Sequence, residues 1–98
     1  MPYFVYILYS SKLDKYYVGQ TSDVDARLAF HNDVERNKIW SARGIPWELK
    51  LQIECLSRGE AAKLERLIKS KKSKKFIDRL VNDEAYRQDF LQKNVEQG

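Results

Sequence analysis

FVYIL at residues 4–8 is followed, after a short polar connection, by YYVGQT at residues 16–21. Both runs are rich in β-branched and aromatic residues, which suit a pleated strand. The connection contains Ser, Lys and Asp, which are typical of turns. The pattern therefore predicts a β-hairpin with strands at about 3–9 and 16–21, and the rest of the 98-residue chain is organised around it.

Tyrosines are concentrated in this hairpin. Five of the six tyrosines of the chain lie within residues 1–17. Side chains alternate between the two faces of a strand, so an even separation between paired positions places Tyr6 and Tyr17 on the same face. We therefore expect two phenol rings side by side on the sheet.

The clearest strand pattern lies at residues 47–55, where WELKLQIEC alternates apolar and polar residues without interruption. This period predicts a third, half-buried strand beside the hairpin. Buried on its apolar face, the single cysteine is expected to be a core residue rather than a reactive thiol. The side chains expected on that one face are Trp47, Leu49, Leu51, Ile53 and Cys55.

Two amphipathic segments with capping residues predict helices. The first, at about 23–32, is expected to have Thr21 or Ser22 as its cap. The second, at about 59–71, follows residues 57–60, whose Ser and Glu have the spacing of a capping box. Together with the strands, these segments predict an α+β fold in which a three-stranded antiparallel sheet is flanked by helices.

The remaining segments are less regular. Residues 33–46 lack a clean period and predict mostly loop, with some helical character at its start. Ser73 is placed to cap a further helix, and a last one is expected at about 85–93. We divide the chain into a domain at 1–82 and a C-terminal helical extension with a frayed tail at 83–98.

The composition excludes several classes of protein. Apolar runs of only a few residues fall short of the roughly 20 residues that span a bilayer, so no membrane contact is expected. The first residues read directly as a strand and show no secretory signal. Cys55 is the single cysteine, so no internal disulfide is expected, which fits a reducing, cytoplasmic location.

Positive charge is concentrated in one segment. The formal net charge is +4, but residues 57–81 alone carry nine Lys/Arg against three Asp/Glu, which is a net +6. Such a patch attracts polyanions and steers their approach. Judged from charge alone, a solvated helical face is an equally good interpretation.

The hairpin also carries a family resemblance. FVY at residues 4–6 stands where a GIY triplet would, and YVG at residues 17–19 stands where YIG would. Arg27, His31 and Glu65 follow at matching spacings. Over residues 3–81 the chain resembles a small, stand-alone member of the GIY-YIG endonuclease domain family, with Phe and Val in place of the first Gly and Ile.

The resemblance implies a metal-dependent endonuclease that hydrolyses phosphodiester bonds in DNA. It assigns Tyr17 as the general base and Tyr6 as the neighbour that positions water or phosphate. It assigns Arg27 as the clamp on the scissile phosphate and His31 as an auxiliary group. Glu65 would be the protein ligand of one Mg²⁺ or Mn²⁺ ion, since one carboxylate is too few for a two-metal site.

The expected partner is nucleic acid, with DNA favoured over RNA, and no obligate protein partner is evident. Five lysines within residues 69–75 suit the neutralisation of several phosphates. Trp40 and Arg43 are candidates for stacking and phosphate contact, although a Trp in such a loop often covers the core instead. The residues expected to bind nucleic acid are Gly19, Arg43, Lys69, Lys71, Lys72, Lys74 and Lys75.

Other interpretations stay open at this level. Without the motif, Arg27 is a surface charge, His31 a partly buried helix residue, and Glu65 the partner of Lys69 in an i,i+4 pair. The main alternative function is a nucleic-acid-binding module with a nuclease-like fold and little or no catalytic activity. A plain structural or interaction domain is the third. One Cys and one His exclude a Cys/His zinc site within one chain.

Overall fold

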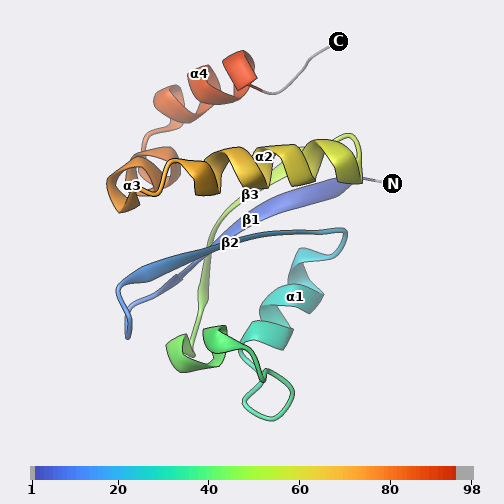
Figure 1. The fold of residues 1–98 in the computed structure, drawn as a ribbon, viewed down its shortest axis with the longest axis vertical. Coiled ribbons are helices and arrows are strands. Elements are labelled where there is room, and N and C mark those ends of the chain that lie inside the picture. The colour runs from blue at the N-terminus through green and yellow to red at the C-terminus, as the bar shows by residue number, and fades with distance from the viewer. Residues whose placement is uncertain (1, 95–98) are drawn as a thin grey trace.

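The structure is a computed structural model, and it describes residues 2–94. An antiparallel sheet of three strands forms its centre: β1 (Tyr3–Ser10), β2 (Lys15–Thr21) and β3 (Glu48–Cys55), in the order β2-β1-β3. The first strand of the chain is thus the middle strand of the sheet (Figure 1). The predicted α+β fold with a three-stranded antiparallel sheet is confirmed.

The four α-helices lie at the places in the sequence where they are predicted. They are α1 (Val24–His31), α2 (Arg58–Ser70), α3 (Lys74–Asn82) and α4 (Glu84–Asn94). A short 3-10 helix, η1 (Trp40–Gly44), precedes β3. Of the end expected to be frayed, residues 94–98, Asn94 is the last residue of α4, and residues 95–98 lie outside the described residues.

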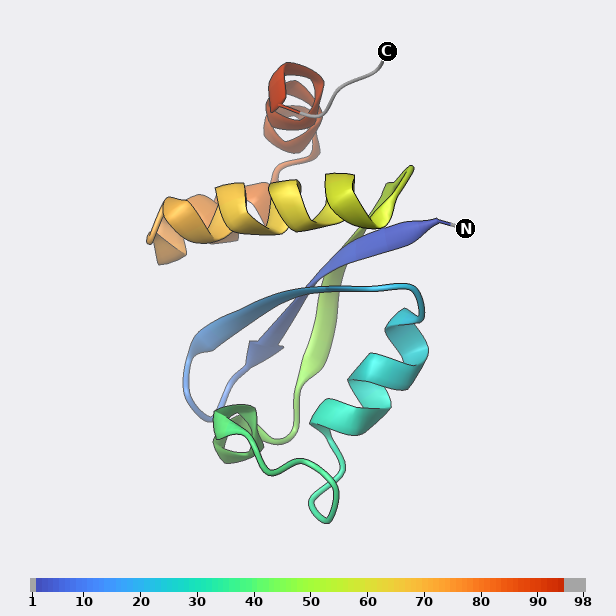
Figure 2. The ribbon, with the colours of Figure 1, turned by 45° about the vertical axis from the view of Figure 1, so that its right-hand side comes forward.

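Helices cover both faces of the sheet (Figures 1 and 2). On one face Val5, Ile7 and Val18 pack against the apolar stripe of α2 and against residues of α3 and α4. On the other face Tyr6 and Leu8 form a second cluster with side chains from α1 and the start of β3. Successive residues of β1 thus supply two cores, which explains why residues 5–8 are all buried.

The apolar side chains of β3 do not share one face, so that prediction is wrong. The pairing with β1 shifts between Ile7 and Leu8, whose partners are Leu51 and Leu49. Such an irregularity reverses the faces beyond it. Leu51 to Cys55 therefore pack on the α2 side, whereas Trp47 and Leu49 pack on the α1 side. Because both faces are covered, both sets are still shielded from water.

The connection between α1 and β3 contains more helix than the sequence predicts. A 3-10 helix, η1, lies near its end, in addition to a single helical turn at its start, where the Asn37 N–H donates to the Asp33 carbonyl. At the start, the Asp33 carboxylate accepts hydrogen bonds from the backbone N–H groups of Glu35 and Arg36. These are the bonds of a helix N-cap, so they favour the single turn at 33–37, which does not extend into a longer helix.

The helix caps are set by short polar side chains. Asp23, and not Thr21 or Ser22, caps α1 by accepting from the Ala26 N–H, whereas Thr21 bonds to the backbone N–H of Asp23. Ser57 caps α2 and Ser73 caps α3, as the sequence predicts.

Cys55 is 2% exposed and lies in the core beside α2. Burial raises the pKa of its thiol, which keeps the group in its unreactive form and confirms its structural role. Within residues 2–94 no helix is both long enough and apolar enough to cross a membrane.

Candidate active site

Tyr6 and Tyr17 come together through the hairpin register. Tyr6 faces Gly19 across the strand pair and Leu8 faces Tyr17, so the two tyrosines are diagonal neighbours on one face. Their ring centroids lie 6.2 Å apart with the planes inclined by 20°. The predicted pair of phenol rings is confirmed. It lies on the face that α1 covers.

Gly19 makes room for the Tyr6 ring. A Cβ atom at position 19 would lie 2.5 Å from the Tyr6 hydroxyl oxygen and 2.6 Å from its Cζ. These distances are far below van der Waals contact, so the phenol crosses β2 directly over the glycine. Gly19 therefore serves the close approach of a side chain of the protein itself.

Gly19→Ala is expected to destabilise the protein by about 1–3 kcal/mol, because the buried Tyr6 ring has no open space to move into. Gly59→Ala is the matched control, since a Cβ there meets nothing closer than 4.0 Å. Within α2, that change should leave stability unchanged or raise it. Urea denaturation of both variants measures the difference, and equal stabilities would contradict this account of Gly19.

His31 contacts both tyrosines and also bonds to the connection between α1 and β3. Its Nε2 lies 3.2 Å from the Tyr6 hydroxyl oxygen, and its ring centroid lies 4.4 Å from that of Tyr17. Its Nδ1 lies 2.9 Å from Ser41 Oγ, which also accepts a hydrogen bond from the Asn37 side chain. Apart from Tyr17, these side chains are at most 2% exposed and form one buried chain of hydrogen bonds.

His31 is a neutral group at neutral pH. Burial lowers the pKa of its imidazole to about 4, and the positive charge of Arg27 adds to the decrease. A neutral imidazole has one nitrogen that donates and one that accepts. The contact with Ser41 therefore sets how the other nitrogen pairs with Tyr6.

Charged groups surround the Tyr6 hydroxyl. Burial raises the pKa of this phenol, and the Arg27 guanidinium beside it opposes the increase. Nearby Tyr17 and the negative charge of Glu65 raise the pKa further. Arg27 also lies over the Phe30 ring, with its Cζ 4.8 Å from the ring centroid, which holds the guanidinium on this side of α1.

Glu65 reaches this region from the opposite direction. Four predicted catalytic residues lie on the α1 side of the sheet, whereas Glu65 belongs to α2, which covers the other face. Its side chain is 20% exposed and bonds to Lys69 Nζ at 2.6 Å, the i,i+4 pair that the sequence allows. The five residues therefore do not lie on one flat surface, and the charge of Glu65 acts on the Tyr6 phenol from the α2 side.

The donor set is compatible with one hard divalent ion. Among residues 2–94, no cluster of three or more His, Cys, Asp or Glu could hold a metal by itself. Mg²⁺ needs no such cluster, because it keeps several waters and is often held by one or two carboxylates together with substrate phosphates. The ion pair between Lys69 and Glu65 would compete only weakly with a metal ion for the carboxylate, since exposed ion pairs contribute about 0–1 kcal/mol.

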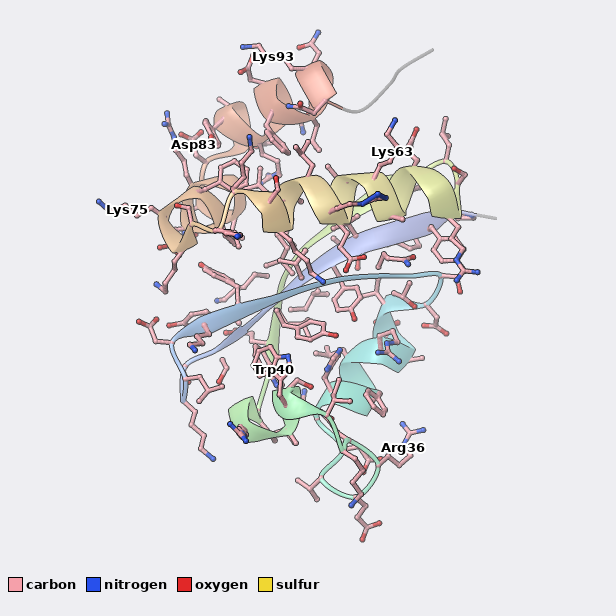
Figure 3. The ribbon with its side chains drawn as sticks, in the orientation of Figure 1. Arg36, Trp40, Lys63, Lys75, Asp83 and Lys93 are labelled. Carbon is pink, nitrogen blue, oxygen red and sulfur yellow. The ribbon has the colours of Figure 1, made fainter. Side chains whose placement is uncertain are left out.

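Apart from Gly19, the predicted nucleic-acid-binding residues fall into two groups. Arg43, Lys71 and Lys75 are exposed and do not line the groove beside Tyr17. Figure 3 shows Lys75 at the start of α3, pointing away from the sheet. The other three lysines line a groove of about 440 Å³ that Tyr17 also lines. These are Lys69, Lys72 and Lys74.

Ser41 and Asn37 are the residues that sequence reasoning missed. Both lie in a connection without periodicity, where small polar residues suggest only turns. The Asn37 side chain also donates to the backbone carbonyl of His31, and the Trp47 indole N–H donates to the carbonyl of Ser41. These bonds fix the connection over the site, and no local pattern in the sequence reveals them.

Known proteins share this architecture. The model of the GIY-YIG catalytic domain family matches residues 2–78. The chain is also similar to the solution NMR structure of a UPF0213 protein from Bacillus halodurans, with 28% identity and a TM-score of 0.51, over 85% of this chain and 89% of that one. No curated protein matches. Since the family match spans most of the chain and includes the paired tyrosines, this protein belongs to the GIY-YIG family of nucleases.

Proposed function

We propose that this protein is a divalent-metal-dependent endonuclease that hydrolyses phosphodiester bonds in DNA. The observation that carries the proposal is the cluster of Tyr6, Tyr17 and His31, in which the Tyr6 hydroxyl lies 3.2 Å from His31 Nε2 and the two phenol rings lie 6.2 Å apart. The charges of Arg27 on α1 and of Glu65 on α2 also act on the pKa of the Tyr6 phenol. Metal-dependent hydrolysis of a phosphodiester uses a base, a cation for the phosphate and a metal ligand in one place.

Tyr17 and Arg27 act directly on the reacting groups in this proposal. Tyr17, which is only partly buried, takes a proton from the attacking water. Arg27 holds the scissile phosphate through charge-assisted hydrogen bonds, for which the planar guanidinium is well suited. Held against Phe30, its guanidinium loses little conformational freedom when the phosphate binds.

Tyr6 and His31 position the other groups. His31 holds the Tyr6 hydroxyl in place, and the hydroxyl orients water or a phosphate oxygen beside Tyr17. Glu65 would hold one Mg²⁺ or Mn²⁺ ion after it releases Lys69. Such an ion supplies positive charge against the negative charge that develops on the phosphate.

A panel of labelled nucleic acids tests the proposal. Duplex, branched and single-stranded DNA and the matching RNAs are incubated with the protein and Mg²⁺ or Mn²⁺, and in parallel with EDTA. Cleavage that requires the metal is expected for at least one DNA, with less for RNA. Binding without cleavage of any substrate would instead indicate a nucleic-acid-binding module with a nuclease-like fold.

The lysine cluster after α2 is proposed to contribute affinity that does not depend on sequence. Reversing Lys71, Lys72 and Lys75 to Glu should weaken binding to unrelated DNAs and flatten the salt dependence, because fewer counterions are released. Lys74 is left unchanged, since it pairs with Asp14 at 3.3 Å and Asp78 at 3.5 Å. Fluorescence anisotropy at several salt concentrations measures both effects. If the affinity for DNA and its salt dependence are unchanged, the cluster is only a solvent-exposed face and does not contribute to DNA binding.

A further inference from the structure

Besides Tyr17, the groove beside it is lined by side chains that have no role in the proposed cleavage step. It runs between β2, η1 and the turn from α2 to α3, and its volume of about 440 Å³ lies within the range of sites that hold small ligands. Its lining includes the aromatic residues Tyr17 and Trp40 and the lysines Lys69 and Lys72. Aromatic and cationic side chains thus line one groove together with the proposed catalytic tyrosine.

Trp40 has a partly exposed ring that packs against other aromatic rings on one side. Its side chain is 49% exposed, although large apolar groups are usually covered. Behind it, the ring packs 5.8 Å from Tyr17 and 6.1 Å from the buried Trp47, measured between centroids. Figure 3 shows Trp40 on the sheet side of η1. One part of the indole is therefore held in place while another part stays open to the groove.

Of the three lysines that line the groove, Lys74 is paired with Asp14 and Asp78, whereas Lys72 is available for phosphate. Within residues 2–94 Lys72 has no ion-pair partner. Lys69 is bonded to Glu65, and a metal ion on that carboxylate would release the ammonium. The backbone of Lys72 has a positive φ of 49°, so the turn itself directs this residue. Cations opposite an aromatic ring suit a ligand with a flat base and a phosphate.

We infer that this groove binds an unpaired nucleotide of the substrate strand, with its base stacked on Trp40 and its phosphate held by Lys72 and Lys69. This inference rests on the proposed nuclease function and adds the form of the substrate. A base inside a duplex has both faces covered by its neighbours, so it offers no face to the indole. An unpaired base has a free face for the indole. Such stacking does not depend on the sequence, because every base has a π-face.

Binding is measured without metal, so that the result does not depend on cleavage. Fluorescein-labelled DNA of one mixed sequence is titrated with protein in EDTA, once as a single strand and once as a blunt duplex. Trp40→Ala should weaken single-strand binding about 10-fold and duplex binding less than about twofold. Trp40→Phe should recover most of the loss, because a ring is kept.

Matched variants separate the groove from general surface effects. Leu56→Ala removes another exposed apolar side chain, 81% exposed and outside the groove, and should change neither affinity. Lys72→Gln should lower the salt slope for the single strand by about 1. Lys63→Gln, an exposed lysine that does not line this groove, should change it less.

Intrinsic fluorescence gives a direct readout of stacking. The chain has two tryptophans, so Trp40→Phe leaves only the buried Trp47. The single strand should quench the fluorescence of the parent protein and leave that of Trp40→Phe nearly unchanged. If Trp40→Ala does not fold, this comparison and Lys72→Gln still test the inference.

The outcomes distinguish this inference from the proposed function. Metal-dependent cleavage by Trp40→Ala at the parent's rate, with unchanged single-strand affinity, would overturn the nucleotide site and keep the nuclease. Loss of single-strand and duplex affinity in equal measure would also overturn it. Selective loss of single-strand binding, in a protein that cleaves nothing on the panel, would keep the nucleotide site and refute the nuclease.

Discussion

Tyr17→Phe is expected to lower the rate of metal-dependent cleavage by about 10²- to 10⁴-fold, because it removes the proton acceptor and keeps the ring. Glu65→Ala should cost at least as much, since it removes the one carboxylate proposed to hold the metal. Folding should be intact in both variants, because Tyr17 is only partly buried and Glu65 lies at the margin of the apolar stripe of α2. Single-turnover cleavage of the preferred substrate measures the rates.

Two variants outside the proposed site serve as controls for this experiment. Tyr86→Phe removes a phenol hydroxyl on α4, and Glu54→Ala removes an exposed carboxylate on β3. Both should cleave at the parent's rate. DNA binding in EDTA should be similar for all four variants, since the roles assigned are in the transition state. Cleavage that survives both Tyr17→Phe and Glu65→Ala would refute the proposed mechanism.

Acidification is expected to destabilise the protein through His31. The folded pKa of about 4 lies below the ordinary value of about 6.5, so the unfolded chain binds the proton more tightly. The free energy of unfolding therefore falls as the pH decreases from about 6.5 to about 4, by about 3 kcal/mol over that range. Above pH 7 this contribution no longer changes. Urea denaturation between pH 7 and 4 measures the decrease.

The variant His31→Gln isolates this effect from the titration of carboxylates. Between pH 7 and 4, its stability should fall by less than that of the parent, with the difference close to the decrease assigned to His31. His31 is the only histidine in the sequence, so its ring signals in an NMR titration need no assignment by mutation. A titration midpoint near 6.5 in the folded protein would contradict a buried, neutral imidazole.

Local sequence patterns were sufficient for the three strands, the four α-helices and the family. The alternation of residues 47–55 predicted β3, and Ser57 and Ser73 predicted the starts of two helices. These features depend on residues within one turn or one strand of each other, so a short stretch of sequence contains their cause. The pairing of Tyr6 with Tyr17 also follows locally, because a short connection limits the register of a hairpin.

The tertiary structure decided how these elements make a site. The reversal of faces within β3 depends on cores on both sides of the sheet, which no alternation pattern reports. The same is true of Ser41 and Asn37, whose bonds to His31 exist only once η1 is folded over the sheet. Glu65 is an ordinary helical carboxylate until α2 is packed against β2. A side chain's chemistry is local, but its burial and its partners are set by packing between segments distant in sequence.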